Sequence, residues 1–126
     1  MGTPHYMAPE QAGGRVKFVG PPADVWALGV VLYECLTGMR PFAADSAEGV
    51  ISRVLTGDAA PPRSVIAGLP RDIDLICRKC LEKNPADRYP SARELADDLR
   101  RFLDGESIRA RRPSVLDRAA KWARRL

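Results

Sequence analysis

The chain has 126 residues, of which 45% are apolar and only 6% aromatic. This length suits one domain, and the apolar content excludes a wholly disordered chain and favours aliphatic helix packing. The net charge is +4, but residues 106–126 hold six arginines and one lysine against Glu106 and Asp117, a net +5, which leaves −1 for residues 1–105. The basic charge therefore belongs to a C-terminal tail and not to the body of the domain.

Pro9 and Glu10 indicate the start of a short helix, because proline is tolerated in a first turn and a carboxylate there lies near the positive end of the helix dipole. Glycines and prolines between residues 13 and 22 then predict an irregular connection. From near Pro22 to Leu36 the sequence is apolar on almost every side of a helix, which is typical of a helix buried all round, and Gly38 ends it.

Three more helices are expected further along the chain. Asp45 and Glu48 form a capping pattern for the first, which ends at Gly57 and whose inward face would be Val50, Ile51, Val54 and Leu55. Pro70 opens the second, with apolar residues at offsets 0, 3, 4, 7 and 8: Ile73, Ile76, Cys77, Cys80 and Leu81.

Ser91 and Glu94 cap the last predicted helix, and Gly105 is placed to end it. Its apolar residues are Leu95, Ala96, Leu99, Phe102 and Leu103. The pattern contains no convincing strand. We therefore predict a mainly α domain over residues 1–104, followed by the basic tail at 105–126.

Four motifs occur in a fixed order: GTPHYMAPE at 2–10, DVWALG at 24–29, GMRPF at 38–42 and CLEKNPADRY at 80–89. Together they resemble the C-terminal, helical lobe of a serine/threonine protein kinase, from the end of the activation segment to the last helix. The long connection at 11–23 and the ending RFLDGESIRAR are similar to the receptor-type kinases of planctomycete bacteria. The resemblance covers nearly the whole chain and implies that the N-terminal lobe and catalytic loop are absent from it.

The resemblance assigns roles to individual residues. Gly2, Thr3 and Pro4 match the loop that positions the residue after the phosphate acceptor, and Thr3 matches the threonine that favours a serine or threonine hydroxyl over tyrosine. Taken alone, Gly-Thr-Pro would indicate only a turn.

Glu10 and Arg88 match a structural ion pair in that family, which a planar guanidinium can make through two parallel bonds. Asp24 matches an aspartate that accepts N–H groups of the catalytic loop, so without that loop we expect it to be exposed or paired elsewhere. Without the resemblance, the pair would be assigned to solvent and Asp24 to ordinary stabilisation of a helix N-terminus.

Other candidate sites have simpler explanations. Cys77 and Cys80 have the spacing of half a zinc site, but only Cys35 and His5 could complete it, so we expect core packing and no metal site. His5 has no nearby partner for a catalytic triad and is interpreted as a loop residue. Three cysteines cannot all pair in disulfides, and the N-terminus has no secretory-signal pattern. Both observations favour a reducing, cytoplasmic location.

The tail at 106–126 is predicted to be basic and amphipathic, with Val115, Ala119, Trp122 and Leu126 on one helical stripe. Such a helix can lie on an anionic membrane surface, and the resemblance implies a juxtamembrane linker that anchors the parent kinase at the cytoplasmic face. A solvated end is the alternative. With one aromatic residue for stacking, no nucleic-acid partner is expected.

Phosphoryl transfer needs a glycine-rich phosphate loop, a strand lysine, catalytic-loop Asp and Asn, and a metal-binding Asp, and the sequence contains none of their motifs. We therefore expect no catalytic, cofactor-binding or metal residues here. The chain is interpreted as the C-terminal part of a kinase that transfers the γ-phosphate of ATP, inactive alone, whose parent needs ATP and magnesium. Its partners would be protein substrates or the missing N-terminal half.

The alternative interpretation is a non-catalytic docking module that uses the helix at 46–56. In either case, the apolar helix at 25–36 lacks some of its expected neighbours, which predicts self-association or a partly molten state.

Overall fold

A computed structural model describes residues 4–14 and 20–110, and within these ranges every regular element is helical. This confirms the mainly α class and is consistent with the helical lobe that the motifs predict. The elements are η1 (Pro4–Tyr6), α1 (Pro9–Ala12), α2 (Pro21–Thr37), α3 (Ala47–Thr56), α4 (Pro62–Val65), α5 (Arg71–Cys80), η3 (Pro85–Asp87) and α6 (Ala92–Leu103).

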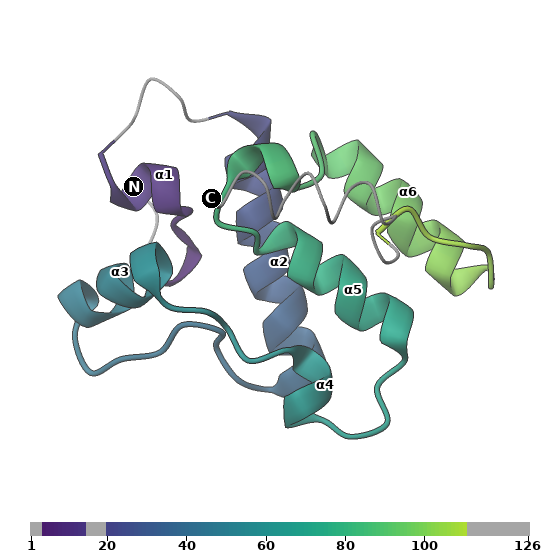
Figure 1. The fold of residues 1–126 in the computed structure, drawn as a ribbon, viewed down its shortest axis with the longest axis horizontal. Helices are drawn as coiled ribbons and strands as arrows, with labels where there is room; N and C mark the ends of the chain where they lie inside the picture. Colours follow the sequence, from purple (N-terminus) through teal and green to yellow (C-terminus); the bar gives the residue numbers. More distant parts are fainter. Residues whose placement is uncertain (1–3, 15–19, 111–126) are drawn as a thin grey trace, which may run out of the picture.

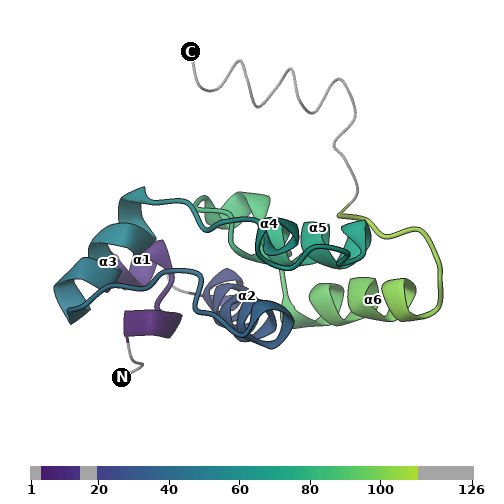
Figure 2. The same ribbon diagram turned by 90° about the horizontal axis from the view of Figure 1, so that it is seen from below.

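Helix α2 is the central element, with α5 and α6 on one side of it and α1 and α3 on the other (Figure 1). Seen from below, α4 and α5 form one layer, and α2 and α6 lie in the other (Figure 2). Consecutive residues on a helix point in different directions. Trp26 therefore packs in a cluster with Val54 and Phe42, whereas Val25 packs in a second cluster with Ile76 and Leu95.

The helix ends are set by local sequence, with one difference from prediction. Gly38 has φ 73° and ends α2, as expected, while its N–H donates to Glu34 O at 2.8 Å. The N-cap of α3 is Ser46 and not Asp45, because the Ser46 Oγ accepts the Gly49 N–H at 3.0 Å. A hydroxyl one residue later thus takes the capping role that the sequence pattern gave to the carboxylate.

The prediction that α2 is buried all round is wrong for the described part of the chain. Leu28 and Val31 are 43% and 45% exposed, and Cys35 is exposed as well. These positions are three and four residues apart, so they form one stripe that no described residue covers fully. The stripe made by Leu28, Val31 and Cys35 is called the α2 stripe below.

The predicted inward face of α5 is confirmed, because Ile73, Ile76, Cys77 and Cys80 are all buried. Three other residues of the predicted apolar faces lie outside the core. Leu55, on α3, is 42% exposed and Leu103, on α6, is 79% exposed, and Ala96 on α6 is exposed as well. Leu103 is the last residue of its helix.

Within the described residues, no helix combines the length and apolarity needed to cross a bilayer. The chain after α6 turns at Gly105, where φ is 74°, and runs back so that Ile108 is only 4% exposed. The packed body therefore continues past the predicted end at 104 to Ala110. The amphipathic segment predicted beyond it lies outside the described residues.

Candidate functional site

The predicted substrate-positioning loop lies mostly outside the described residues, since Gly2 and Thr3 precede them and Pro4 is the first residue of η1. The turn that follows it is tied to α2. The Tyr6 hydroxyl donates to Glu34 Oε2 at 3.3 Å, and Arg40 Nη1 donates to His5 Nε2 at 2.6 Å. A guanidinium cannot accept, so the His5 ring accepts at Nε2 and carries its proton on Nδ1. His5, interpreted as a loop residue, thus helps to hold η1.

Glu10 and Arg88 lie together although they are far apart in sequence. The Arg88 guanidinium donates from Nη1 to Glu10 Oε2 and from Nη2 to Glu10 Oε1, both at 2.8 Å. The Arg88 side chain is fully buried, and that of Glu10 is 7% exposed. This bidentate geometry joins the first turn of α1 to the loop before α6.

The remaining donors of Arg88 are satisfied by backbone carbonyls. Nε donates to Glu82 O at 2.8 Å, Nη1 to Pro22 O at 3.1 Å and Nη2 to Lys83 O at 3.2 Å. Burial alone raises the pKa of Glu10, but the hydrogen bond and the charge of Arg88 outweigh it and hold the pKa below the ordinary value of a glutamate. The pair therefore favours the ionised form of Glu10.

Aromatic rings flank the pair on the side of the first core cluster. Trp26 and Phe42 stack with ring centroids 5.5 Å apart, and the Arg88 guanidinium carbon lies 5.0 Å from the Trp26 centroid. Lys83 Nζ lies 4.3 Å from the Phe42 centroid, buried and without a hydrogen-bond acceptor in the described part of the chain. Burial lowers the pKa of Lys83, an effect that the charge of Asp58 partly offsets. Sequence reasoning did not single out this cation, although it lies within the CLEKNPADRY motif at 80–89.

Asp24 is exposed in the first turn of α2, and its side chain makes no hydrogen bond or ion pair with the described residues. The structure therefore does not bring it to the Glu10–Arg88 pair. Its position still suits the ordinary stabilisation of a helix N-terminus.

The two cysteines of the Cys-x-x-Cys motif are core residues, as predicted. The Cys77 thiol donates to Gly29 O at 3.7 Å, and burial raises the pKa of Cys80 to about 12. Both sulfurs therefore stay protonated and fill space between α2 and α5. Within the described ranges, no group of three or more His, Cys, Asp or Glu side chains could hold a metal ion.

A second buried carboxylate, Asp98 on α6, was not predicted. It is 0% exposed and accepts hydrogen bonds from the Tyr89 hydroxyl, from Arg101, and from the N–H groups of Arg109 and Ala110. Desolvation raises the pKa of Asp98, but these donors outweigh it and hold the pKa below the ordinary value of an aspartate. The signal was available in sequence, because an aspartate at offset 3 from Leu95 lies on the apolar face of α6.

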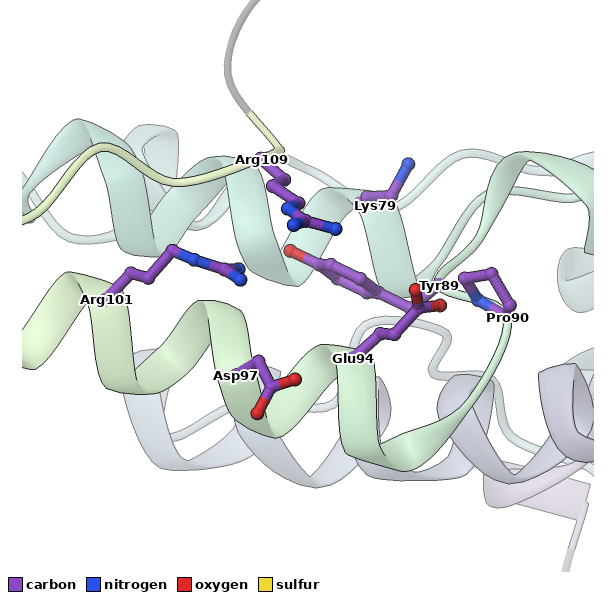
Figure 3. Close-up of a pocket in the computed structure, with 7 residues that line it drawn as sticks. All are labelled: Lys79, Tyr89, Pro90, Glu94, Asp97, Arg101 and Arg109. Atoms are coloured by element: carbon purple, nitrogen blue, oxygen red, sulfur yellow. The ribbon is translucent and has the colours of Figure 1, made fainter.

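A pocket of about 230 Å³ lies beside this carboxylate. Figure 3 shows the Tyr89 ring within it, between Arg109 and Lys79 on one side and residues of α6 on the other. The α6 residues that line it are Glu94, Asp97 and Arg101. The pocket is thus mixed in charge.

Comparison with known proteins gives the same family as the motifs. The family model described as protein kinase domain matches residues 1–99. The chain is 46% identical over 98 residues to the tyrosine-protein kinase MasK of Myxococcus xanthus, a match that covers 78% of this chain and 15% of that protein. It is 42% identical over 121 residues to the serine/threonine-protein kinase PknB of Mycobacterium tuberculosis, covering 96% of this chain and 19% of that protein.

Among solved structures, the twitchin kinase region from C. elegans matches with a TM-score of 0.67 and 29% identity, over 74% of this chain and 16% of that one. The chain thus spans less than a fifth of the length of each of these proteins.

Proposed function

Because the chain belongs to the protein kinase family, we propose that it is the C-terminal lobe of a serine/threonine protein kinase and that it positions the protein substrate. The observation that supports this most is the buried bidentate pair of Glu10 and Arg88, at the end of the segment in which the Gly2-Thr3-Pro4 motif lies. A segment held by two such bonds cannot drift relative to α2. Accurate positioning of the acceptor is a large part of phosphoryl-transfer catalysis.

The groups that transfer the phosphate would belong to the rest of the parent protein. The chain has no glycine-rich loop, His-Arg-Asp or Asp-Phe-Gly motif, and its described residues offer no donor set suited to magnesium. We therefore propose that the chain is inactive alone and that ATP and magnesium bind elsewhere in the parent. The N-terminal half of the kinase would be its first partner.

Which residue accepts the phosphate, serine or threonine as opposed to tyrosine, is part of the proposal. The named relatives include a tyrosine-protein kinase and a serine/threonine-protein kinase. Thr3 favours the second, because the matching threonine in serine/threonine kinases selects a short hydroxyl acceptor. Asp24, which is exposed here, would accept N–H groups of the catalytic loop once that loop is present.

A chimaera tests the proposal. Residues 1–126 would replace the matching segment of the Mycobacterium tuberculosis relative, and phosphoamino acids would be identified after incubation with Mg·ATP and a mixed protein substrate. We expect phosphoserine and phosphothreonine, a strong loss with Thr3→Val, and no transfer by residues 1–126 alone. A folded, ATP-binding chimaera that makes only phosphotyrosine, or no phosphoprotein at all, would contradict the assignment.

We further propose that the basic tail places a planctomycete-like receptor kinase at the cytoplasmic face of a membrane. The support is its net +5 charge over residues 106–126. The full chain should sediment with vesicles of anionic lipid at low salt and not with neutral vesicles. Changing Arg124 and Arg125 to Gln should weaken that binding, while the same change at Arg53 and Arg93 should not.

A non-catalytic docking module is the second candidate, favoured by the α2 stripe, which leaves Leu28 and Val31 accessible. An inactive but folded chimaera, together with tight binding of the free chain to an intact kinase, would favour this candidate over the first.

A further inference from the structure

We propose that residues 106–110 form a C-terminal strap held by Asp98, and that attachment of this strap is coupled to the Glu10–Arg88 pair through the adjacent residues Arg88 and Tyr89. The inference rests on the proposed function only in that the pair borders the proposed substrate-positioning loop. The coupling itself is a property of the fold.

The attachment depends on one saturated carboxylate. Asp98 Oδ1 accepts from Arg101 Nη1 at 3.0 Å and from the Arg109 N–H at 2.7 Å, and Oδ2 accepts from the Tyr89 hydroxyl at 2.6 Å and from the Ala110 N–H at 3.0 Å. A carboxylate has about four acceptor positions, so all of them are used. Two of the four donors are backbone groups of the strap.

The strap is a small unit that can open without unfolding the lobe. Apart from the bonds to Asp98, its Glu106 N–H donates to Arg101 O at 2.8 Å, and Ile108 is its one buried apolar side chain. It lies beyond residues 1–99, where the kinase family model matches. Segments with so few contacts open locally at a lower cost than the whole domain.

Arg88 and Tyr89 connect this attachment to the ion pair. Arg88 has an extended backbone, with φ −82° and ψ 175°, and in extended chain successive side chains point to opposite sides. The Arg88 side chain accordingly reaches Glu10, while the Tyr89 side chain reaches Asp98. Both side chains are therefore fixed by partners at different ends of the described chain.

The pocket gives Tyr89 room to move when the strap leaves. Arg109 of the strap and the Tyr89 ring both line it (Figure 3). When the strap opens, Asp98 would lose the N–H donors of Arg109 and Ala110. Its carboxylate would then reorient toward Arg101 or solvent, and the Tyr89 hydroxyl would either follow it or lose its acceptor. In this proposal, movement of the Tyr89 side chain would shift the backbone that it shares with Arg88, and this shared backbone would couple the strap to the ion pair.

Amide hydrogen exchange in the full chain tests this coupling. Asp98→Asn should speed exchange at Arg109 and Ala110, and also at Gln11 and Ala12 of α1, by about fivefold or more relative to Gly38. Gln11 and Ala12 donate to Ala8 O at 3.0 and 2.9 Å, next to Glu10 in α1, and Gly38 lies at the far end of α2. The matched control is Asp97→Asn, since Asp97 is the preceding residue of the same helix and its side chain makes no hydrogen bond or ion pair with the described residues.

Reciprocity gives the second half of the test. Glu10→Gln should speed exchange at Arg109 and Ala110 by a factor similar to the one Asp98→Asn produces in α1. If Asp98→Asn does not fold, Tyr89→Phe, which removes only a hydroxyl, takes its place with the same expectation.

The coupling is overturned if α1 exchange stays within about twofold of wild type while the strap opens, or if Asp97→Asn has the same effect. An equal rise at Gly38 also overturns it, because the change would then be global. None of these readouts depends on phosphoryl transfer, so failure of the proposed function would leave the test intact.

Discussion

All the N–H donors of the Arg88 guanidinium are hydrogen-bonded. An arginine side chain has five N–H donors, and here two bind the Glu10 carboxylate while the others bind the carbonyls of Pro22, Glu82 and Lys83. A lysine has three donors on one atom and cannot reproduce this fork. The site is therefore specific for arginine and not merely for positive charge.

Removal of Arg88 should be costly, because Glu10 would remain buried without a partner. We expect Arg88→Ala to lower the free energy of unfolding by about 3–5 kcal/mol, and Arg88→Lys to recover only a small part of it. Chemical denaturation provides the measurement. Arg93→Ala, at an exposed position of α6, should stay within about 0.5 kcal/mol of wild type. Equal stability of the Arg88 and Arg93 variants would show that the pair is dispensable.

The buried carboxylates also predict acid sensitivity. The pKa values of Glu10 and Asp98 are lowered in the folded chain, so below about pH 5 the unfolded chain binds more protons than the folded one. Stability should therefore be fully present near neutral pH and should fall as the pH drops through the folded pKa values. Denaturation curves between pH 7 and pH 3 would show this, and Glu10→Gln should have a shallower dependence. A stability that rises on acidification would contradict the ionised pair.

At the scale of elements, periodicity predicted α5 well because its apolar face packs on α2 along its whole length. It was less successful for α2, where described residues cover Leu28 and Val31 only in part, since the number of partners around a helix is a tertiary property. Ser46 was missed because two adjacent residues could cap α3, and only the backbone geometry selects the hydroxyl. The position of Asp98 on the apolar face of α6 could have marked it as buried, but its donors could not be predicted, because two of the four come from a strap that has no motif.

Helices α2 and α5 approach closely at Gly29. A Cβ on this residue would lie 2.4 Å from Cys80 Cβ, which is too short for two carbon atoms. Although alanine favours a helix over glycine by about 1 kcal/mol, we expect Gly29→Ala to destabilise the chain by about 1–3 kcal/mol through overpacking. Thermal denaturation is the measurement. A variant as stable as wild type would mean that α2 and α5 are further apart than described.

The α2 stripe should drive self-association of the free chain. Changing Leu28 and Val31 to Gln removes apolar surface that is already 43% and 45% exposed, so the folded state loses little. Sedimentation velocity should show fewer oligomers for this double variant. Leu103→Gln, at a residue 79% exposed at the end of α6, is the control and should leave the distribution unchanged. Oligomers that persist in the double variant would place the associating surface elsewhere.

At the scale of the whole molecule, the ion pair joins the two core clusters. Glu10 lies two residues after Ala8, which packs in the cluster around Trp26. Arg88 lies directly before Tyr89, which packs in the cluster around Ile76. The motifs predicted the protein kinase family, and the Glu10–Arg88 pair followed only from that resemblance, since without it both residues would be assigned to solvent. The motifs did not predict that the pair lies between two clusters, because that depends on which side chains of α2 pack in each cluster.

The central claim is that Glu10 and Arg88 form one buried interaction that holds α1 against the loop before α6. A double-mutant cycle of Glu10→Gln and Arg88→Met, measured by urea denaturation in the chain that also carries Gln at positions 28 and 31, tests it most directly. We predict a coupling energy of about 2–3 kcal/mol in a single cooperative transition. Effects of the two changes that add within about 0.5 kcal/mol would contradict the claim.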